Sequence, residues 1–225
     1  MRFEACIFDL DGVLVDTARF HFLAWKRLAD ELGIHFTEKE NERLKGVSRM
    51  DSLEIILEYG DKKYTETEKR SFAERKNKWY VEYISGMTPA DIMPGTLPLL
   101  KSLRKKGIKT AVGSASKNTP LILERTGLQP LFDAVADGNI ISKAKPDPDI
   151  FLAAARMLHT DPRKCIVFED AEAGVKAALN AGMFCIGVGN SNVLHQAHEV
   201  IGSLEEINLE KLKSILEHEG YKEPF

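Results

Sequence analysis

The chain has 225 residues, of which 44% are apolar and 29% charged, and its formal net charge is −3. These values are typical of a soluble globular protein with one large domain, or with a domain that carries a small insertion. They exclude the basic surface of a nucleic-acid-binding protein, and no apolar run approaches the roughly 18 residues that a membrane span needs.

The start of the chain and its cysteines indicate a cytoplasmic protein. Residues 1–4 lead directly into an apolar run and lack the pattern of a secretion signal. Cys6, Cys165 and Cys185 each lie inside an apolar run, and no two of them form a Cys-x-x-Cys pair. We therefore expect three buried, reduced thiols in a reducing compartment.

The first apolar run, Ala5–Phe8, leads directly to two aspartates, Asp9 and Asp11, and then to Gly12. Residues two apart in a strand point to the same side, and open α/β sheets bind ligands at the carboxyl ends of their strands. Two neighbouring carboxylates repel each other unless a cation, a proton or a reaction compensates. The run therefore indicates a reaction or cation site, and the structural alternative is an acidic turn after an edge strand.

A block of helical patterns without a convincing strand follows the first strand. We expect a small helical cap domain at residues 16–87, inserted into a core formed by residues 1–15 and 88–225. The two connections, near Val15–Thr17 and Ser85–Pro89, can act as a hinge. The expected helices are Phe20–Leu32, Arg49–Tyr59 and Thr65–Ile84.

Short apolar runs then alternate with helical patterns such as Leu97, Leu100 and Leu103. Near-continuous apolar strands that alternate with helices are typical of a parallel sheet covered on both faces. The sequence therefore predicts an α/β fold, and we expect the last residues, Glu217–Phe225, to fray. The strands expected after the first are Thr110–Gly113, Ala134–Ala136, Cys165–Phe168 and Phe184–Val188.

Three further polar segments follow the first in the order of the chain. The segment Ser114–Asn118 stands between a strand and a helix, where hydroxyls, an amide and helix N–H groups suit a phosphate. Ser116 or Asn118 could equally be a plain helix cap. Lys145 lies in a proline-stiffened loop, where its ammonium can neutralise a phosphoryl group or simply be solvated.

The fourth polar segment is Glu169-Asp170, at the end of another strand. Two carboxylates at a strand end suit a hard cation with oxygen ligands, above all Mg²⁺, although Asp170 could instead cap the next helix. Since all four segments can meet at one edge of the sheet, their order is a strong joint indication of a reaction site.

The order Asp9-x-Asp11-Gly12, Ser114, Lys145 and Glu169-Asp170 resembles the haloacid dehalogenase superfamily, whose members are mostly Mg²⁺-dependent phosphoryl-transfer enzymes. The resemblance implies a Rossmann-like core and covers nearly all of it. Within the superfamily the insertion is most similar to that of mutases acting on sugar phosphates. The segments that carry this closer resemblance are Asp16–Lys26, Leu44–Arg49, Glu74–Asn77 and Ser114–Asn118.

The resemblance implies a role for each motif residue. Asp9 would attack phosphorus and form an aspartyl phosphate, while Asp11 would act as general acid and base. Ser114 and Lys145 would bind the other phosphoryl oxygens. The implied ligands of Mg²⁺ are Asp9, the backbone carbonyl of Asp11, Glu169 and Asp170. The implied substrate-binding residues are Thr17, His21, Gly46, Val47, Ser48, Arg49, Lys76, Ala115, Ser116, Lys117 and Asn118.

The cap residues are ambiguous without the resemblance. Arg49 opens a helix, where its guanidinium suits a second phosphate, but it could be a surface arginine. His21 lies on an apolar helix and is structural by default. Lys76 lies in a charged run that is normally solvated, and Trp25 is either a core residue or a platform for ligand.

The resemblance implies an isomerase that moves a phosphoryl group between the 1- and 6-positions of glucose through a bisphosphorylated intermediate. We expect a monomer that acts on a phosphorylated sugar and binds no nucleic acid or membrane. The alternative is a Mg²⁺-dependent sugar-phosphate phosphatase, in which water receives the phosphoryl group. A binding module is disfavoured because both acids of the first motif are intact, and a dehalogenase because of Asp11 and the acids at 169 and 170.

Overall fold

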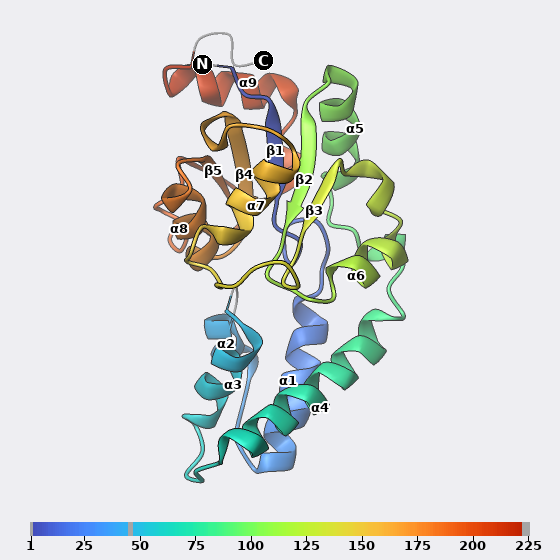
Figure 1. Cartoon of the computed structure of the whole chain (residues 1–225), viewed down its shortest axis with the longest axis vertical. Coiled ribbons are helices and arrows are strands. Elements are labelled where there is room, and N and C mark those ends of the chain that lie inside the picture. Colours follow the sequence, from blue (N-terminus) through green and yellow to red (C-terminus); the bar gives the residue numbers. More distant parts are fainter. Residues whose placement is uncertain (1, 45–46, 222–225) are drawn as a thin grey trace.

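The computed structural model describes residues 2–44 and 47–221, which form two lobes (Figure 1). The core lobe is a six-stranded sheet with helices on both faces, and the cap lobe is helical. This arrangement confirms the expected α/β fold with a helical insertion near the start of the chain. The cap lobe contains α1 (Ala18–Leu32), α2 (Glu38–Asn41), α3 (Arg49–Leu57) and α4 (Glu66–Ile84).

The sheet has the strand order β3-β2-β1-β4-β5-β6, and every neighbouring pair is parallel. The five predicted strands are confirmed to within one residue at each end. The sixth was missed because it is a short edge strand that begins with a glutamate. The strands are β1 (Ala5–Phe8), β2 (Lys109–Gly113), β3 (Ala134–Ala136), β4 (Cys165–Glu169), β5 (Phe184–Val188) and β6 (Glu199–Ile201).

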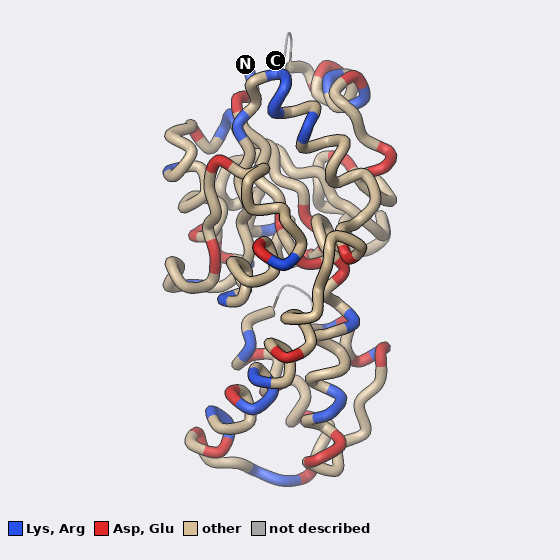
Figure 2. Tube along the Cα trace, turned by 90° about the vertical axis from the view of Figure 1, so that its right-hand side faces the viewer, with Lys and Arg blue, Asp and Glu red and all other residues tan. Residues whose placement is uncertain are grey.

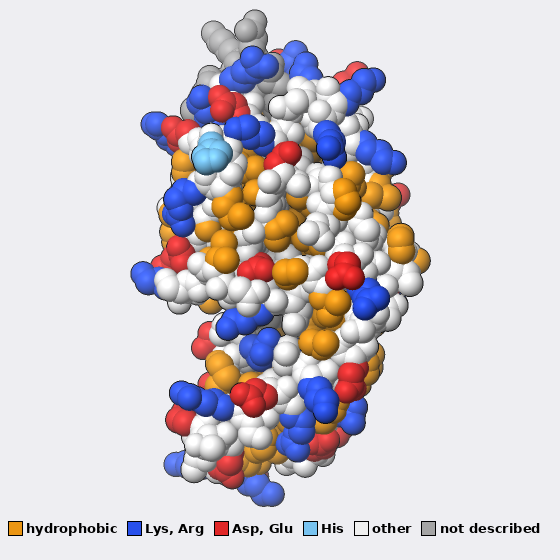
Figure 3. Space-filling view, turned by 45° about the vertical axis from the view of Figure 1, so that its right-hand side comes forward, with side chains coloured by type: hydrophobic (Ala, Val, Ile, Leu, Met, Phe, Trp, Pro, Cys, Tyr) orange, Lys and Arg blue, Asp and Glu red, His pale blue; other side chains and the backbone are white. Residues whose placement is uncertain are grey.

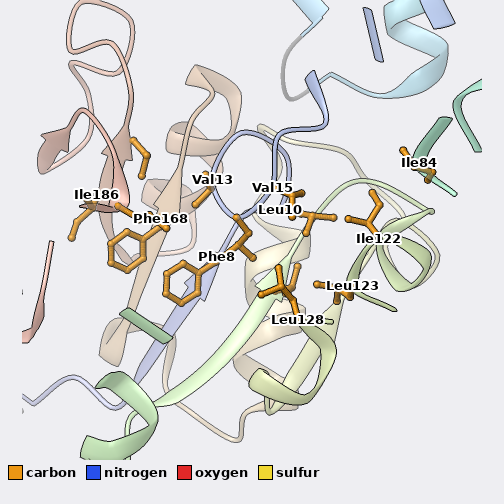
Figure 4. Close-up of a cluster of buried hydrophobic side chains, with 14 of the residues drawn as sticks. Phe8, Leu10, Val13, Val15, Ile84, Ile122, Leu123, Leu128, Phe168 and Ile186 are labelled. Carbon is orange, nitrogen blue, oxygen red and sulfur yellow. The ribbon is translucent and has the colours of Figure 1, made fainter. Parts of the chain in front are cut away.

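Successive residues of β1 serve two different hydrophobic clusters, one on each face of the sheet. Cys6 and Phe8 belong to the first cluster, and Ala5 and Ile7 to the second. Figure 4 shows Phe8 beside Phe168 of the neighbouring strand, with ring centroids 4.7 Å apart and planes 6° apart. Because both faces are covered, every residue of this strand is apolar and buried.

Each of the core-lobe helices described here contributes apolar side chains to one of these two clusters. The first cluster takes apolar residues from α5 (Thr96–Lys106), α6 (Thr119–Thr126) and α9 (Leu209–His218). The second takes them from α7 (Asp149–Met157) and α8 (Glu172–Asn180). The helices thus leave the carboxyl ends of the strands, which face the cap lobe, open to a ligand (Figure 1).

The predicted cap helices are confirmed with small shifts at their ends. Helix α1 begins earlier than expected, α3 ends earlier, and Thr65 caps α4 from outside by accepting a hydrogen bond from the Glu68 N–H. The short helix α2 was not predicted. It is held by a capping box between Thr37 and Glu40, a local signal too short to register as a helical repeat.

The expected fraying of the C-terminal end is wrong for residues 217–221. Helix α9 continues to His218, and Tyr221 packs edge-on against Phe3 with ring centroids 4.9 Å apart. The apolar side chains Leu212 and Leu216 bury one face of this helix in the core. Residues 222–225 lie outside the described part of the chain.

Lysine and arginine positions alternate with aspartate and glutamate positions along the chain in both lobes (Figure 2). Within residues 2–44 and 47–221, no helix combines the length and the apolar character that crossing a membrane requires.

Candidate active site

A cavity of about 500 Å³ lies where the two lobes meet, within the usual size range of ligand pockets. Figure 3 shows the surface hollowed at this junction, with lysine or arginine side chains beside the hollow. The predicted site residues that line the cavity are Asp9, Asp11, His21, Val47, Ser48, Arg49, Lys76, Ala115, Ser116, Lys117, Asn118, Lys145, Glu169 and Asp170. The fold therefore brings all four core motifs and the cap positions together.

Three predicted residues are not on the described cavity wall. Thr17 and Ser114 are fully buried and lie behind it, each bonded to a residue that lines the cavity. Gly46 lies outside the described residues.

The floor of the cavity is a buried ion cluster of Asp9, Lys145 and Glu169. The Lys145 ammonium donates hydrogen bonds to Asp9 and, at 2.8 Å, to Glu169. The three side chains are at most 8% exposed. Burial alone would lower the pKa of Lys145, but the two carboxylates outweigh it and raise that pKa. Lys145 is therefore a buried cation of the site and not a solvated loop residue.

Two acids at the end of β4 complete a group of oxygen ligands. Carboxylate oxygens of Asp9, Glu169 and Asp170 lie within 4.8 Å of one another. Burial raises the pKa of Glu169 to about 7 against the opposing effect of Lys145. Asp170 does not cap α8, because Ala171 occupies the N-cap position of that helix. These three side chains could therefore hold a metal ion.

Two glycines make room for these acids. A Cβ on Gly12, whose φ is +81°, would lie 2.2 Å from the Asp170 carboxylate oxygen. A Cβ on Gly174 would lie 2.0 Å from the Glu169 carboxylate carbon. Gly12 is thus required both for its left-handed backbone and for the close approach of Asp170.

Asp11 is held by the start of the cap lobe. The Thr17 hydroxyl donates a hydrogen bond to its carboxylate, and a backbone bridge pairs Asp11 with Val15. Burial and the nearby Asp9 charge raise the pKa of Asp11 to about 6. Asp11 can thus hold or release a proton near neutral pH, as a general acid and base must.

The loop after β2 is built from short backbone contacts. The Ser114 N–H donates to the Ala136 carbonyl at 3.1 Å, and its hydroxyl accepts from the Ser116 N–H at 3.1 Å. Asn118 is at the N-cap position of α6 but makes no side-chain cap. Its side-chain amide donates instead to the side-chain oxygen Oδ1 of Asn77 at 3.1 Å, which joins the core lobe directly to α4 of the cap lobe.

Arg49 enters the cavity from the first turn of α3. Ser48 caps this helix by accepting a hydrogen bond from the Asp51 N–H at 3.3 Å. Arg49 is partly buried and lines the cavity, and burial lowers the pKa of its guanidinium. It is therefore a cavity residue and not an ordinary surface arginine.

Lys76 is 2% exposed, so the charged run around it is not a uniformly solvated face. Its ammonium lies 4.4 Å and 4.7 Å from the ring centroids of Trp25 and Tyr80, and 3.1 Å from His21 Nδ1. Burial and the positive charge of Arg49 lower the pKa of Lys76, and burial also lowers that of His21. The negative charge of Asp11 opposes this lowering, and the two aromatic rings add cation–π contacts. Trp25 is both a core residue and part of the cavity wall.

Sequence reasoning missed several cavity residues on α4, among them Asn77 and Tyr80. Asn77 contacts the core lobe through Asn118, and Tyr80 lies one helical turn after Lys76. The spacing of four residues places Tyr80 on the same helix face as Lys76, and this signal could have identified it.

Comparison with known proteins identifies the family of this chain. Residues 3–182 match the family described as haloacid dehalogenase-like hydrolase. The chain therefore belongs to this family.

Individual members of the family are similar to this chain over most of its length. Over 211 residues, 93% of each chain, the sequence is 47% identical to the beta-phosphoglucomutase of Bacillus subtilis (strain 168). The crystal structure of the beta-phosphoglucomutase of Clostridium difficile superposes with a TM-score of 0.92 at 43% identity, covering 98% of this chain and 100% of that one. The phosphorylated carbohydrates phosphatase of Thermotoga maritima is 34% identical over 80% of this chain and 82% of its own.

Proposed function

We propose that this chain is a β-phosphoglucomutase, which interconverts β-D-glucose 1-phosphate and glucose 6-phosphate through glucose 1,6-bisphosphate. One observation carries the proposal: a single cavity is lined by the Asp9 cluster and also by Arg49 and the loop 116–118. A mutase substrate keeps one phosphate while another is transferred, so it needs two phosphate sites. The similarity to mutases over nearly the whole chain supports this.

The two lobes have different roles in this function. Residues 1–15 and 88–225 form the catalytic core, and residues 16–87 form the cap domain. The core contributes the reacting groups, and the cap contributes residues that hold the rest of the substrate. The protein acts as a cytoplasmic monomer on a phosphorylated sugar, and the mixture of basic and acidic residues along both lobes (Figure 2) suits neither nucleic acid nor a membrane surface.

The metal that fits the site is Mg²⁺. The three carboxylates that lie within 4.8 Å of one another form an oxygen-only donor set, as this hard cation prefers. Asp9, Glu169 and Asp170 would hold it, together with the backbone carbonyl of Asp11. When bound, Mg²⁺ supplies positive charge that screens the carboxylate from the phosphoryl oxygens.

Asp9 is the nucleophile of the reaction. In the enzyme phosphorylated on Asp9, the 6-hydroxyl of glucose 1-phosphate attacks phosphorus, the bond between phosphorus and the Asp9 carboxylate breaks, and Asp11 accepts the hydroxyl proton. The bisphosphate then turns over in the cavity. Asp9 attacks the phosphorus on the 1-position, the P–O bond to the sugar breaks, and Asp11 returns its proton to that oxygen. Lys145 and Ser114 stabilise the other phosphoryl oxygens during both transfers.

Arg49 and the loop 116–118 hold the phosphate that is not being transferred. A guanidinium binds phosphate with two parallel hydrogen bonds, and neighbouring N–H groups add further donors. Because Arg49 belongs to the cap and the loop to the core, a phosphate between them draws the lobes together. Closure excludes water and protects the aspartyl phosphate from hydrolysis.

A sugar-phosphate phosphatase is the second candidate. The relative from Thermotoga maritima, a phosphatase by name, favours it. The core chemistry would be the same up to the aspartyl phosphate, which water would then hydrolyse.

The experiment that separates the two functions compares wild type with Arg49→Ala. Glucose 6-phosphate is measured by a coupled assay, and inorganic phosphate is measured in the same samples. Wild type should isomerise with little phosphate release. Arg49→Ala should isomerise roughly 10- to 100-fold more slowly, because a charge-assisted contact to the phosphate is lost. This variant should also release more phosphate per turnover.

Arg43→Ala is the matched control, since Arg43 is an exposed cap arginine paired with Glu58. This variant should behave as wild type. Normal isomerisation by Arg49→Ala would refute the second phosphate site. Phosphate release without isomerisation by wild type would establish the phosphatase.

A further inference from the structure

Tyr80 is the one buried side chain among residues 2–44 and 47–221 whose polar atom lacks a hydrogen-bond partner. The residue is 1% exposed and lines the cavity from α4. Burying a hydroxyl without a partner costs free energy, whereas a phenylalanine would fill the same space without this cost. A tyrosine at this position therefore indicates that its partner arrives with a ligand.

The phenol ring of Tyr80 packs among cap-lobe residues that also line the cavity. Its ring packs against the His21 ring with centroids 4.1 Å apart, and the Lys76 ammonium lies 4.7 Å from its centroid. Burial and the negative charge of Asp11 raise the pKa of Tyr80 well above its usual value, so the group keeps its proton. It is thus a neutral donor on the cap side of the cavity.

The other polar groups near the phenol do not supply a hydrogen-bond partner for its hydroxyl. The Thr17 hydroxyl is near enough to lower the pKa of Tyr80, but it gives its only proton to Asp11, and no hydrogen bond joins the two hydroxyls. The Lys76 ammonium has donors only and faces the ring, and His21 Nδ1 is 3.1 Å from that ammonium. What the site lacks is a small neutral group that can accept and donate, which is the chemistry of a sugar hydroxyl.

We propose that the Tyr80 hydroxyl binds one sugar hydroxyl of the substrate and so helps determine which sugar is accepted. This inference rests on the proposed function, which places a sugar phosphate in the cavity. A site built to bind a hydroxyl discriminates strongly against an analogue that lacks it, because the protein group is then left unpaired.

The test compares Tyr80→Phe with wild type on β-glucose 1-phosphate and on its 2-deoxy, 3-deoxy and 4-deoxy analogues. For the parent sugar, we expect Tyr80→Phe to lower kcat/KM by about 10- to 100-fold. For one deoxy analogue, the two enzymes should agree within about twofold, because the partner of the phenol is missing there. An equal loss on every sugar, or no loss on the parent sugar, would overturn the inference.

Two controls exclude a structural explanation. Tyr83→Phe removes a phenol hydroxyl from the same helix at a position outside the cavity wall, and it should leave the whole panel unchanged. Tyr80→Phe should melt at or above the temperature of wild type, since the hydroxyl lacks a partner among the described residues. A lower melting temperature would mean that the hydroxyl has a structural partner, and would overturn the inference.

The inference and the proposed function can fail separately. If wild type releases phosphate instead of isomerising, kcat/KM for phosphate release on the same panel tests Tyr80 equally well. Calorimetric binding of glucose 6-phosphate gives a readout besides turnover, and Tyr80→Phe should weaken it by a similar factor. If no sugar phosphate of the panel binds or reacts with wild type, both proposals are wrong.

Discussion

Replacing Lys145 by Met should destabilise the metal-free protein, because two buried carboxylates lose their cation. The Lys145 and Glu169 side chains are each 1% exposed, and that of Asp9 is 8% exposed. Removing one partner of such a buried cluster lowers the free energy of unfolding by about 3–5 kcal/mol. For a chain of this size, each 1 kcal/mol shifts Tm by roughly 2–4 °C, so Tm should fall by about 6–20 °C.

This loss of stability should shrink as the pH falls. Burial already raises the pKa of Glu169 to about 7 with Lys145 in place, and removing the ammonium raises that pKa further. A carboxyl whose folded pKa lies above its unfolded value destabilises the fold where it is ionised. Protonation as the pH falls through the folded pKa removes that cost. The difference in Tm should therefore be smaller at about pH 5.5 than at about pH 7.5.

Thermal melting in the presence of a chelator, repeated with added Mg²⁺, measures these effects. Mg²⁺ should raise Tm more in Lys145→Met than in wild type, because the ion takes the place of the lost charge. Lys164→Met is the matched control, since Lys164 pairs with Glu4 at 2.6 Å but is 38% exposed. An exposed pair contributes little. If both variants melt at the same temperature, the buried cluster does not stabilise the fold as argued.

Further predictions concern the reacting groups. Asp9→Asn should remain folded and lose all turnover, because the amide keeps the shape but not the nucleophile, and clear residual transfer would contradict covalent catalysis there. Activity should vanish on chelation and return with Mg²⁺. Asp170→Ala should raise the Mg²⁺ concentration needed for half-maximal rate, whereas the distant control Glu217→Ala should leave that concentration unchanged. Asp11→Ala should lower kcat by roughly 100- to 10,000-fold while substrate still binds, and a change confined to KM would show that Asp11 is not the acid and base.

Local patterns in the sequence determine the core lobe and the order of its motifs. A strand buried on both faces needs an unbroken apolar run, so β1, β4 and β5 are visible as such. The polar residues that follow them must lie at one edge of a parallel sheet, whatever the details of packing. For this reason the sequence alone predicts that the acids at 9, 11, 169 and 170 lie together.

Only the tertiary structure decided the state of the long polar side chains. Nothing local distinguishes Lys76 from its charged neighbours on α4, yet it is buried against Trp25 because α1 and α4 pack together. Lys145 likewise meets Asp9 and Glu169 only where three distant segments converge. Whether a polar side chain is buried or paired depends on the residues that face it across the cavity. Those residues are distant in the sequence, so the local pattern around Tyr80 does not reveal that its hydroxyl lacks a partner.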